Sequence, residues 1–178
     1  MADTENTEDT YTLALGILAG TSACLRAMLE QLPPDIWQWS PAAGEWSPRQ
    51  VLDHMLQVET AVIPVRVRRM IEEDGAPLAG VAQTSIPAAP AEVLKAWLAA
   101  REQNLSYLHT LTPPQLAQGG EHPRYGRISA REHIIEWAYH DLEHMRQLQA
   151  TLEARLYPAI GGFRALYSKP YPEGNPSA

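Results

Sequence analysis

Residues 129–148 read SAREHIIEWAYHDLEHMRQL, and this stretch predicts the last long helix of the chain. Ser129 and Glu132 have the S-x-x-E spacing of a capping box, in which two side chains satisfy backbone N–H groups at the start of a helix. Apolar residues then recur every three or four positions, as on one face of an amphipathic helix. The helix is therefore expected to begin at Ser129 and to run to about Arg155.

Three histidines share the apolar face of this helix. At about 100° of rotation per residue, His133, His140 and His144 fall within roughly 40° of one another. His140 and His144 are one turn apart, and two imidazoles at this spacing can bind one ion. His133 is about 10 Å further back, too far to share that ion. The pair alone is equally compatible with buried histidines that hydrogen-bond to their neighbours. The opposite face is expected to carry the polar residues Glu132, Glu136, Glu143, Arg146 and Gln147.

A second helix has an equally clear start. Ser47 is the expected N-cap, Pro48 takes the first helical position and Gln50 completes another capping box. This helix is expected to continue to about residue 74, where Gly75 ends it. Pro64 lies inside it and should kink the helix or remove one of its hydrogen bonds.

Two further helices complete the set, one over about residues 9–31, which stops before Pro33 and Pro34, and one over about residues 90–111. Residues 76–88 and 119–127 are expected to be loops, residues 158–178 an irregular tail, and no stretch convincingly resembles a strand. Four helices in 178 residues predict a single all-α domain, a four-helix bundle spanning residues 1–178. The long linkers permit crossovers as well as hairpins, so the pattern leaves the topology open.

Charge and composition exclude several classes of protein. The net charge of -7 disfavours nucleic-acid binding, which draws its affinity from basic side chains. The single cysteine, Cys24, allows no disulfide within the chain and fits a reducing compartment. The acidic N-terminus is unlike a secretory signal, and no stretch approaches the roughly 20 apolar residues of a membrane span. We therefore expect a soluble, cytoplasmic protein that binds neither nucleic acid nor membranes.

Two segments resemble the motifs of a known family. Residues 45–55, EWSPRQVLDHM, resemble the start of the second helix in the DinB-like (YfiT-like) metalloenzymes. REHI at residues 131–134 and HDLEHMRQL at residues 140–148 resemble the last helix of the same proteins. The motifs lie in the expected order, and the resemblance covers most of the chain. This is the damage-inducible helical-bundle family, not the DNA polymerase that shares its name.

The resemblance implies a metal site. In that family a divalent ion, usually zinc or nickel, is bound by one histidine of the second helix and an H-x-x-x-H pair of the last. These ligands correspond to His54, His140 and His144. By itself His54, at the border of the apolar stripe of its helix, is also typical of a surface residue. The resemblance further implies an up-down-down-up bundle and a homodimer.

Three neutral histidines leave an open position on the ion, as in catalytic sites. Family members include S-transferases, so the resemblance implies a thiol S-transferase that joins a low-molecular-weight thiol, such as bacillithiol or mycothiol, to a small-molecule substrate. Two alternatives use the same ligands, namely a metal-dependent hydrolase and a non-catalytic, metal-stabilised module for binding or dimerisation. Asp141, on the inward face, is expected to orient a ligand imidazole, in preference to Glu59 or Asp53.

The same helix also fits a rival motif. HDLEH at residues 140–144 matches the H-x-x-E-H pattern of inverted zinc peptidases, in which Glu143 would be the general base. That class needs a distant acidic ligand downstream, and only Glu153 and Glu173 follow. Glu143 is also directed roughly 80–100° away from the histidine pair around the helix. A peptidase is therefore disfavoured.

Overall fold

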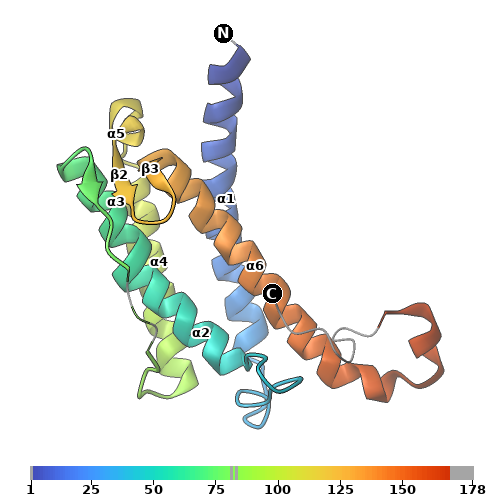
Figure 1. Ribbon diagram of the computed structural model, residues 1–178. Coiled ribbons are helices and arrows are strands. Elements are labelled where there is room, and N and C mark those ends of the chain that lie inside the picture. The colour runs from blue at the N-terminus through green and yellow to red at the C-terminus, as the bar shows by residue number, and fades with distance from the viewer. Residues whose placement is uncertain (1, 81, 83, 169–178) are drawn as a thin grey trace.

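Four long helical segments form the body of the computed structural model, which describes residues 2–80, 82 and 84–168. They are α1 (Ala2–Leu29), the continuous run of α2 (Pro48–Gln57), η1 (Val58–Val62) and α3 (Ile63–Glu72), then α4 (Pro90–Leu108) and α6 (Ala130–Leu156). Helix α1 packs against α4 and α6, and α2 packs against the same two helices (Figure 1). The predicted all-α four-helix bundle is confirmed.

The loop between α3 and α4 is a crossover that makes these two segments parallel. At its start, Arg66 of α3 donates hydrogen bonds to the carbonyl of Ala79. At its end, Arg49 of α2 donates to the carbonyls of Ile86 and Ala88. The loop therefore runs back along α3 and α2, and α1 and α6 run opposite to α2–α3 and α4 (Figure 1). This is the up-down-down-up order that the family resemblance implied.

The interior of the bundle is filled by apolar side chains from all four segments. Fully burying a large apolar side chain contributes about 1.5–3 kcal/mol, so this core is the main source of stability. Its most deeply buried apolar members include Leu18, Leu25, Met55, Trp97, Ile134, Trp137 and Leu148.

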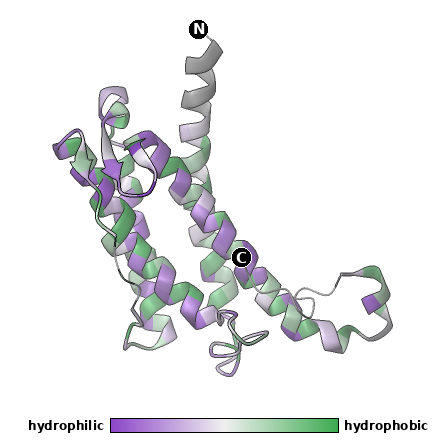
Figure 2. Ribbon diagram, in the orientation of Figure 1, coloured by the Kyte–Doolittle hydropathy of each residue, from purple (hydrophilic) through white to green (hydrophobic). Residues whose placement is uncertain are grey.

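The described side chains of helix α1 include many apolar ones, which alternate with polar ones along the ribbon (Figure 2). Its segment Thr10–Leu29 has a mean hydropathy of 1.5 and is, by length and composition, apolar enough to cross a membrane. The expectation that no stretch approaches such a span was therefore wrong. In the bundle, Leu18, Leu25 and Leu29 of this segment are buried against other helices, while Leu13 on its other side is exposed. A core helix of a soluble protein passes the same test.

Both predicted capping boxes are present. Ser47 accepts a hydrogen bond from the N–H of Gln50, whose side chain accepts one from the N–H of Ser47 at 3.0 Å. Ser129 and Glu132 make the same reciprocal pair at the start of α6. These caps fix where the two helices that carry the candidate ligands begin.

Pro64 is accommodated by a π-helical segment, Val58–Val62, which ends two residues before it. The N–H of Ile63 bonds to the carbonyl of Val58, five residues back. Because Pro64 has no N–H to donate, the α-helical ladder is interrupted at this point in any case. The wider turn changes which side chains face the core, and Glu59 within it is fully buried.

A small sheet, which the sequence did not predict, lies beside the C-terminal end of α3 and the N-terminal end of α6. Strand β1 (Ala76–Pro77) pairs in parallel with β2 (Gly119–His122), and β2 pairs antiparallel with β3 (Gly126–Ser129). The expectation of loops without strands here was wrong, because strands of two and four residues are too short for a periodic pattern. Gly120 allows the close pairing, since a Cβ there would lie 2.8 Å from the carbonyl of Ala76.

The remaining differences from the predicted elements are at the ends of helices and in the tail. The first helix begins at Ala2, and the helices end within three residues of the predicted positions. A short helix, α5 (Pro113–Ala117), was missed, and the 3-10 segment η2 (Tyr157–Leu166) occupies part of the tail predicted to be irregular. Residues 169–178 of that tail lie outside the described residues.

Candidate metal centre

Three histidines meet between α2 and α6. The Nε2 atom of His140 lies 3.0 Å from that of His54 and 3.1 Å from that of His144. One ligand atom from each ring lies within 4.8 Å of the other two, and all three rings are half-buried. The structure thus brings together the three histidines that the sequence singled out, from two helices that are far apart in the chain.

The spacing of these nitrogens fits a divalent transition-metal ion. Zinc-to-nitrogen distances are about 2.0–2.1 Å, so ligand nitrogens around a tetrahedral ion lie about 3.3 Å apart. The observed separations of 3.0 and 3.1 Å are close to that value. A neutral imidazole has one lone pair, and a single ion accepts all three lone pairs at once.

Burial and mutual repulsion keep the rings neutral. Burial, followed by the proximity of His144 and His140, lowers the pKa of His54 to about 4. Burial and the proximity of His144 likewise lower the pKa of His140 to about 4. Burial also lowers the pKa of His144. At neutral pH the rings therefore offer lone pairs, which a metal ligand requires.

We expect the stability of the metal-free protein to fall as the pH is lowered from about 6.5 through about 4. Over this range the unfolded chain protonates His54 and His140, whose ordinary pKa is 6.5, whereas the folded chain holds both neutral until about pH 4. The contribution is fully present above pH 6.5 and is lost as the pH falls. The measurement is the urea midpoint of chelator-treated protein across this range.

The matched variants for this pH series are His54→Asn and His109→Asn. The first removes one of the buried titrating rings and should reduce the acid-dependent loss of stability. The second removes an exposed histidine at the end of α4 and should not. The same pH dependence in both variants and in the wild type would contradict the expectation.

Two side chains hold the rings in position. Gln147 Oε1 lies 2.9 Å from Nδ1 of His144, so it accepts a hydrogen bond from the tautomer that carries its proton on Nδ1, and in that tautomer Nε2 is free to bind an ion. The ring of Trp46 stacks on His144 with a centroid distance of 5.9 Å and meets His54 edge-on at 5.2 Å. Sequence reasoning placed Gln147 on the outward face and gave Trp46 no role in the site. The i, i+3 spacing of Gln147 from His144 was the available indication.

Replacing Gln147 by leucine is expected to lower metal affinity by about 10–100-fold, the usual effect of losing a residue that orients a ligand. The ring of His144 would lose the acceptor that fixes its proton on Nδ1. Competition with a chromophoric chelator measures the affinity. Gln149→Leu, an exposed position on the same helix, is the matched control. Equal affinities for the two variants would argue against this role of Gln147.

Asp141 has different partners from those predicted. Its carboxylate lies 2.6 Å from the guanidinium of Arg101 and accepts a hydrogen bond of 2.6 Å from Thr21, instead of contacting a ligand imidazole. Glu59, the first alternative, lies 2.6 Å from the other side of the same guanidinium. Asp53, the second, is paired with an arginine of its own helix. The buried network connects α1, η1, α4 and α6, so it links the helix that carries His140 and His144 to the segment that continues α2, the helix of His54.

His133 lies outside the triad, as its distance along the helix predicted. It is buried, and its Nδ1 atom lies 3.2 Å from the carboxylate of Glu136, which had been expected on the opposite face. Glu143 is paired with Arg146 through two hydrogen bonds of 2.8 Å. An arginine therefore neutralises the carboxylate that the rival peptidase motif would use as its base.

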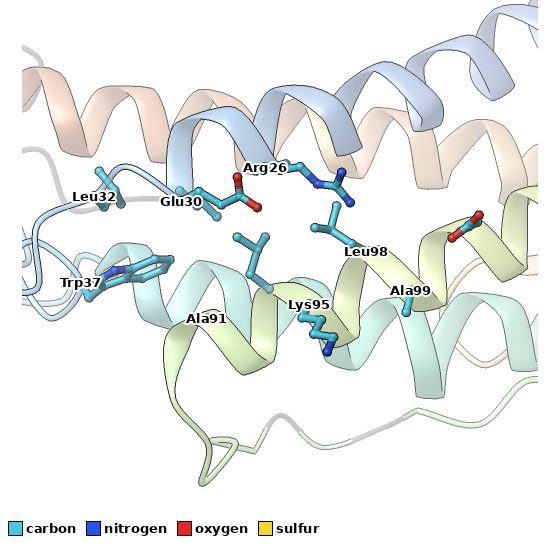
Figure 3. Close-up of a pocket in the computed structure, with 11 residues that line it drawn as sticks. Arg26, Glu30, Leu32, Trp37, Ala91, Lys95, Leu98 and Ala99 are labelled. Atoms are coloured by element: carbon cyan, nitrogen blue, oxygen red, sulfur yellow. The ribbon is translucent and has the colours of Figure 1, made fainter.

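A cavity of about 530 Å³ lies between the end of α1, the following linker and the start of α4 (Figure 3). Leu98 and Trp37 contribute to its apolar wall, and Arg26 of α1 and Glu30, just beyond the end of that helix, also line it (Figure 3). None of the residues that line it belongs to the triad. The triad lies between α2 and α6, so the cavity is separate from the candidate metal centre.

Comparison with known proteins identifies the family. The sequence model that describes the DinB superfamily matches residues 18–148 of this chain, which include both motifs. The chain belongs to the DinB superfamily. No curated protein matches the sequence.

Two solved structures are similar in fold. YfiT from Bacillus subtilis, described as a probable metal-dependent hydrolase with an unusual four-helix bundle topology, has a TM-score of 0.74 at 18% identity, over 82% of this chain and 87% of YfiT. TT2238, described as a four-helix bundle protein, has a TM-score of 0.61 at 24% identity, over 79% of this chain and 98% of TT2238. At these identities the likeness establishes the fold of this DinB-superfamily chain.

Proposed function

We propose that this protein is a metal-dependent enzyme that binds a divalent transition-metal ion, zinc or nickel, through His54, His140 and His144. The observation that carries the proposal is the convergence of three Nε2 atoms from two helices, with separations of 3.0 and 3.1 Å. An ion with three histidine ligands and an open position lowers the pKa of a water or thiol held there. Trp46 and Gln147 support this role because they hold the rings with Nε2 facing one point.

The nucleophile that we propose is a low-molecular-weight thiol, such as bacillithiol or mycothiol. This rests on the S-transferases to which the two histidine motifs are similar. In such a transfer the sulfur forms a bond to an electrophilic carbon and the leaving group departs with its bonding electrons. The thiol proton passes to a base, so the reaction needs no oxidant or reductant.

Hydrolysis is the second candidate. It is favoured by the similar fold of YfiT, which is described as a probable metal-dependent hydrolase. The same three ligands and the same open position serve water in place of a thiol. The two candidates therefore differ in the nucleophile and not in the metal site.

A thiol-consumption assay tests the proposal. Untagged protein loaded with zinc or nickel is incubated with a model electrophile and with bacillithiol, mycothiol, glutathione or coenzyme A. We expect thiol loss with at least one of them, and we expect chelation to abolish it. Metal-dependent hydrolysis of ester or amide substrates, without thiol loss, would favour the second candidate.

A metal-stabilised module without catalysis makes a different prediction. Metal would raise the melting temperature, because it binds the folded chain, but no reaction would depend on it. A higher melting temperature combined with no metal-dependent reaction of any thiol or hydrolysable substrate would therefore favour this third alternative.

A further inference from the structure

Helix α1 leaves much of its apolar surface uncovered. Its segment Thr10–Leu29 is apolar enough to cross a membrane, yet only 28% of its most apolar stretch is buried inside the bundle. Leu13 on its outer side is 61% exposed, and Tyr139 and Leu142 on the neighbouring helix α6 are 62% and 41% exposed. Single exposed apolar side chains are ordinary, but a contiguous patch of them on a soluble chain marks an interaction surface.

A groove of about 540 Å³ between α1 and α6 joins these side chains into one surface. The two helices lie side by side and run in the same direction (Figure 1). Leu13 is about 20° from Gly20 around α1. Tyr139 is about 60° from Leu142 around α6, so both exposed residues flank the groove. We define the outer face as Leu13, Tyr139 and the groove-lining residues Ile17, Gly20, Cys24, Leu142, Met145 and Arg146.

The outer face carries no net charge. No Asp, Glu, Lys or Arg occurs between Asp9 and Arg26 in the sequence. On α6, Arg146 is the charged residue that lines the groove, and it is paired with Glu143 through two hydrogen bonds of 2.8 Å. The whole chain has a net charge of -7, so two copies repel one another over most of their surfaces. At the outer face two copies can meet without this repulsion.

Charge also favours a second copy of the chain over a membrane as the partner of this face. Helices that lie on membranes carry Lys and Arg beside their apolar side, where these residues attract anionic lipids. Residues 2–9, which precede the apolar segment, contain four acidic residues. An anionic lipid surface would therefore repel this end of α1, whereas a neutral protein face would not.

The outer face is large enough for a dimer. A segment of 20 residues is about 30 Å long, and two helices packed side by side are about 20 Å wide. The face therefore covers about 600 Å² on each copy, and the total of about 1,200 Å² reaches the lower end of the range for stable complexes. His140 and His144 are about 160° from Leu142 around α6, so a partner on this face leaves the candidate metal centre uncovered.

We propose that two copies of this chain form a two-fold dimer through the outer face of α1 and α6. In a two-fold dimer the same patch of each copy contacts that of the other, so the exposed apolar side chains cover one another. The homodimer that the family resemblance implied did not specify a surface. The dimer does not depend on the metal centre, because none of the three histidines lines the groove.

Gly20→Glu tests this surface. Within the described chain a Cβ at Gly20 meets nothing within 4 Å, and glutamate is a better helix former than glycine, so the monomer should fold as before. In the dimer each copy would bury an unpaired carboxylate, which should raise the dissociation constant by at least about 100-fold. Sedimentation equilibrium measures this constant, and we expect the wild type to be dimeric at about 10 µM.

Gly162→Glu is the matched control. Gly162 lies in η2, beyond the end of α6, and an added Cβ there also meets nothing within 4 Å among the described residues. This variant makes the same change of side chain and charge away from the outer face. Its dissociation constant should equal that of the wild type.

Cys24 reports on the same face in the unaltered protein. It is exposed in the single chain and is the only cysteine of the sequence, so a maleimide modifies this position selectively. The rate of modification should fall by at least about tenfold as the protein concentration rises to about 100 times the dissociation constant, because mass action depletes the monomer. In Gly20→Glu the rate should stay constant over the same range of concentration.

A wild type that is monomeric at about 100 µM would overturn the proposal. Equal dissociation constants for the wild type and Gly20→Glu would do the same, as would a dimer in which Cys24 reacts equally fast at every concentration, since the interface would then lie elsewhere. Vesicles of phosphatidylcholine and phosphatidylglycerol test the other partner. Co-sedimentation of a monomeric wild type with them, lost in Gly20→Glu, would assign the outer face to a lipid surface instead.

Discussion

Replacing Arg101 by methionine is expected to lower the free energy of unfolding by about 3–5 kcal/mol, because it leaves two buried carboxylates without their common partner. Arg101 is 1% exposed, and its guanidinium donates hydrogen bonds to both Glu59 and Asp141. It also lies over the rings of Trp97 and Trp137, at 4.8 and 5.4 Å from their centroids. A domain of this size has about 5–15 kcal/mol of stability in total, so the loss is large.

Urea unfolding measures this effect, with Lys95→Met as the matched control. Lys95 is exposed on the same helix, and its replacement should change the stability by less than about 0.5 kcal/mol. Replacing Glu59, Arg101 and Asp141 together by leucine, methionine and leucine should recover part of the loss, since no buried charge is then unpaired. A loss below about 1 kcal/mol for Arg101→Met would show that the network does not brace the bundle.

The parts of the fold that the sequence predicted correctly depend on local interactions. The capping boxes at Ser47 and Ser129 are completed by residues three positions later, so the starts of two helices are visible in a few letters. The same holds for the spacing of His140 and His144 on one face of α6. The place of His54 was not fixed by its own helix, and the family resemblance was needed to pair it with α6.

The expectation that Gln147 and Glu136 lie on the outward face was wrong. At about 100° of rotation per residue, Gln147 is about 20° and Glu136 about 40° from His140 around the helix, so both are beside the triad. Gln147 was expected on the outward face, yet its amide oxygen lies 2.9 Å from His144. Glu136 was expected there too, yet its carboxylate contacts the buried ring of His133.

The buried ion network could not be predicted from the sequence, for a different reason. Charged residues are almost always exposed unless they are paired, and the pairs here join residues far apart in the chain. Arg101 meets Glu59 and Asp141 from 42 and 40 positions away. The burial of Glu59 also depends on the π-helical turn before Pro64, for which the proline was the only indication. The preference for Asp141 over Glu59 and Asp53 as the residue that orients a ligand imidazole therefore could not take its pairing with Arg101 into account.

Replacing His140 by alanine is expected to lower metal affinity by more than about 100-fold, because losing a residue that only orients a ligand already lowers affinity by 10–100-fold. His140 is the central member of the triad, since its Nε2 atom is the one that lies 3.0 and 3.1 Å from the other two. The expectation is measured by metal analysis of untagged protein after repletion and by thermal unfolding with and without metal. A ligand at about 1,000 times its Kd stabilises the folded state by about 4 kcal/mol, so the wild type should melt at a clearly higher temperature with metal.

His109→Ala separates the loss of this ligand from the loss of any imidazole. His109 is exposed at the end of α4, outside the triad, so this variant should keep the wild-type metal content and the wild-type shift in melting temperature. His140→Ala should lose both, while its metal-free form stays folded because the rings do not supply the core. Less than about 0.2 equivalents of metal in the wild type, unchanged in His140→Ala, would show that the three histidines do not form a metal site. Full metal content in His140→Ala would instead place the ion elsewhere in the bundle.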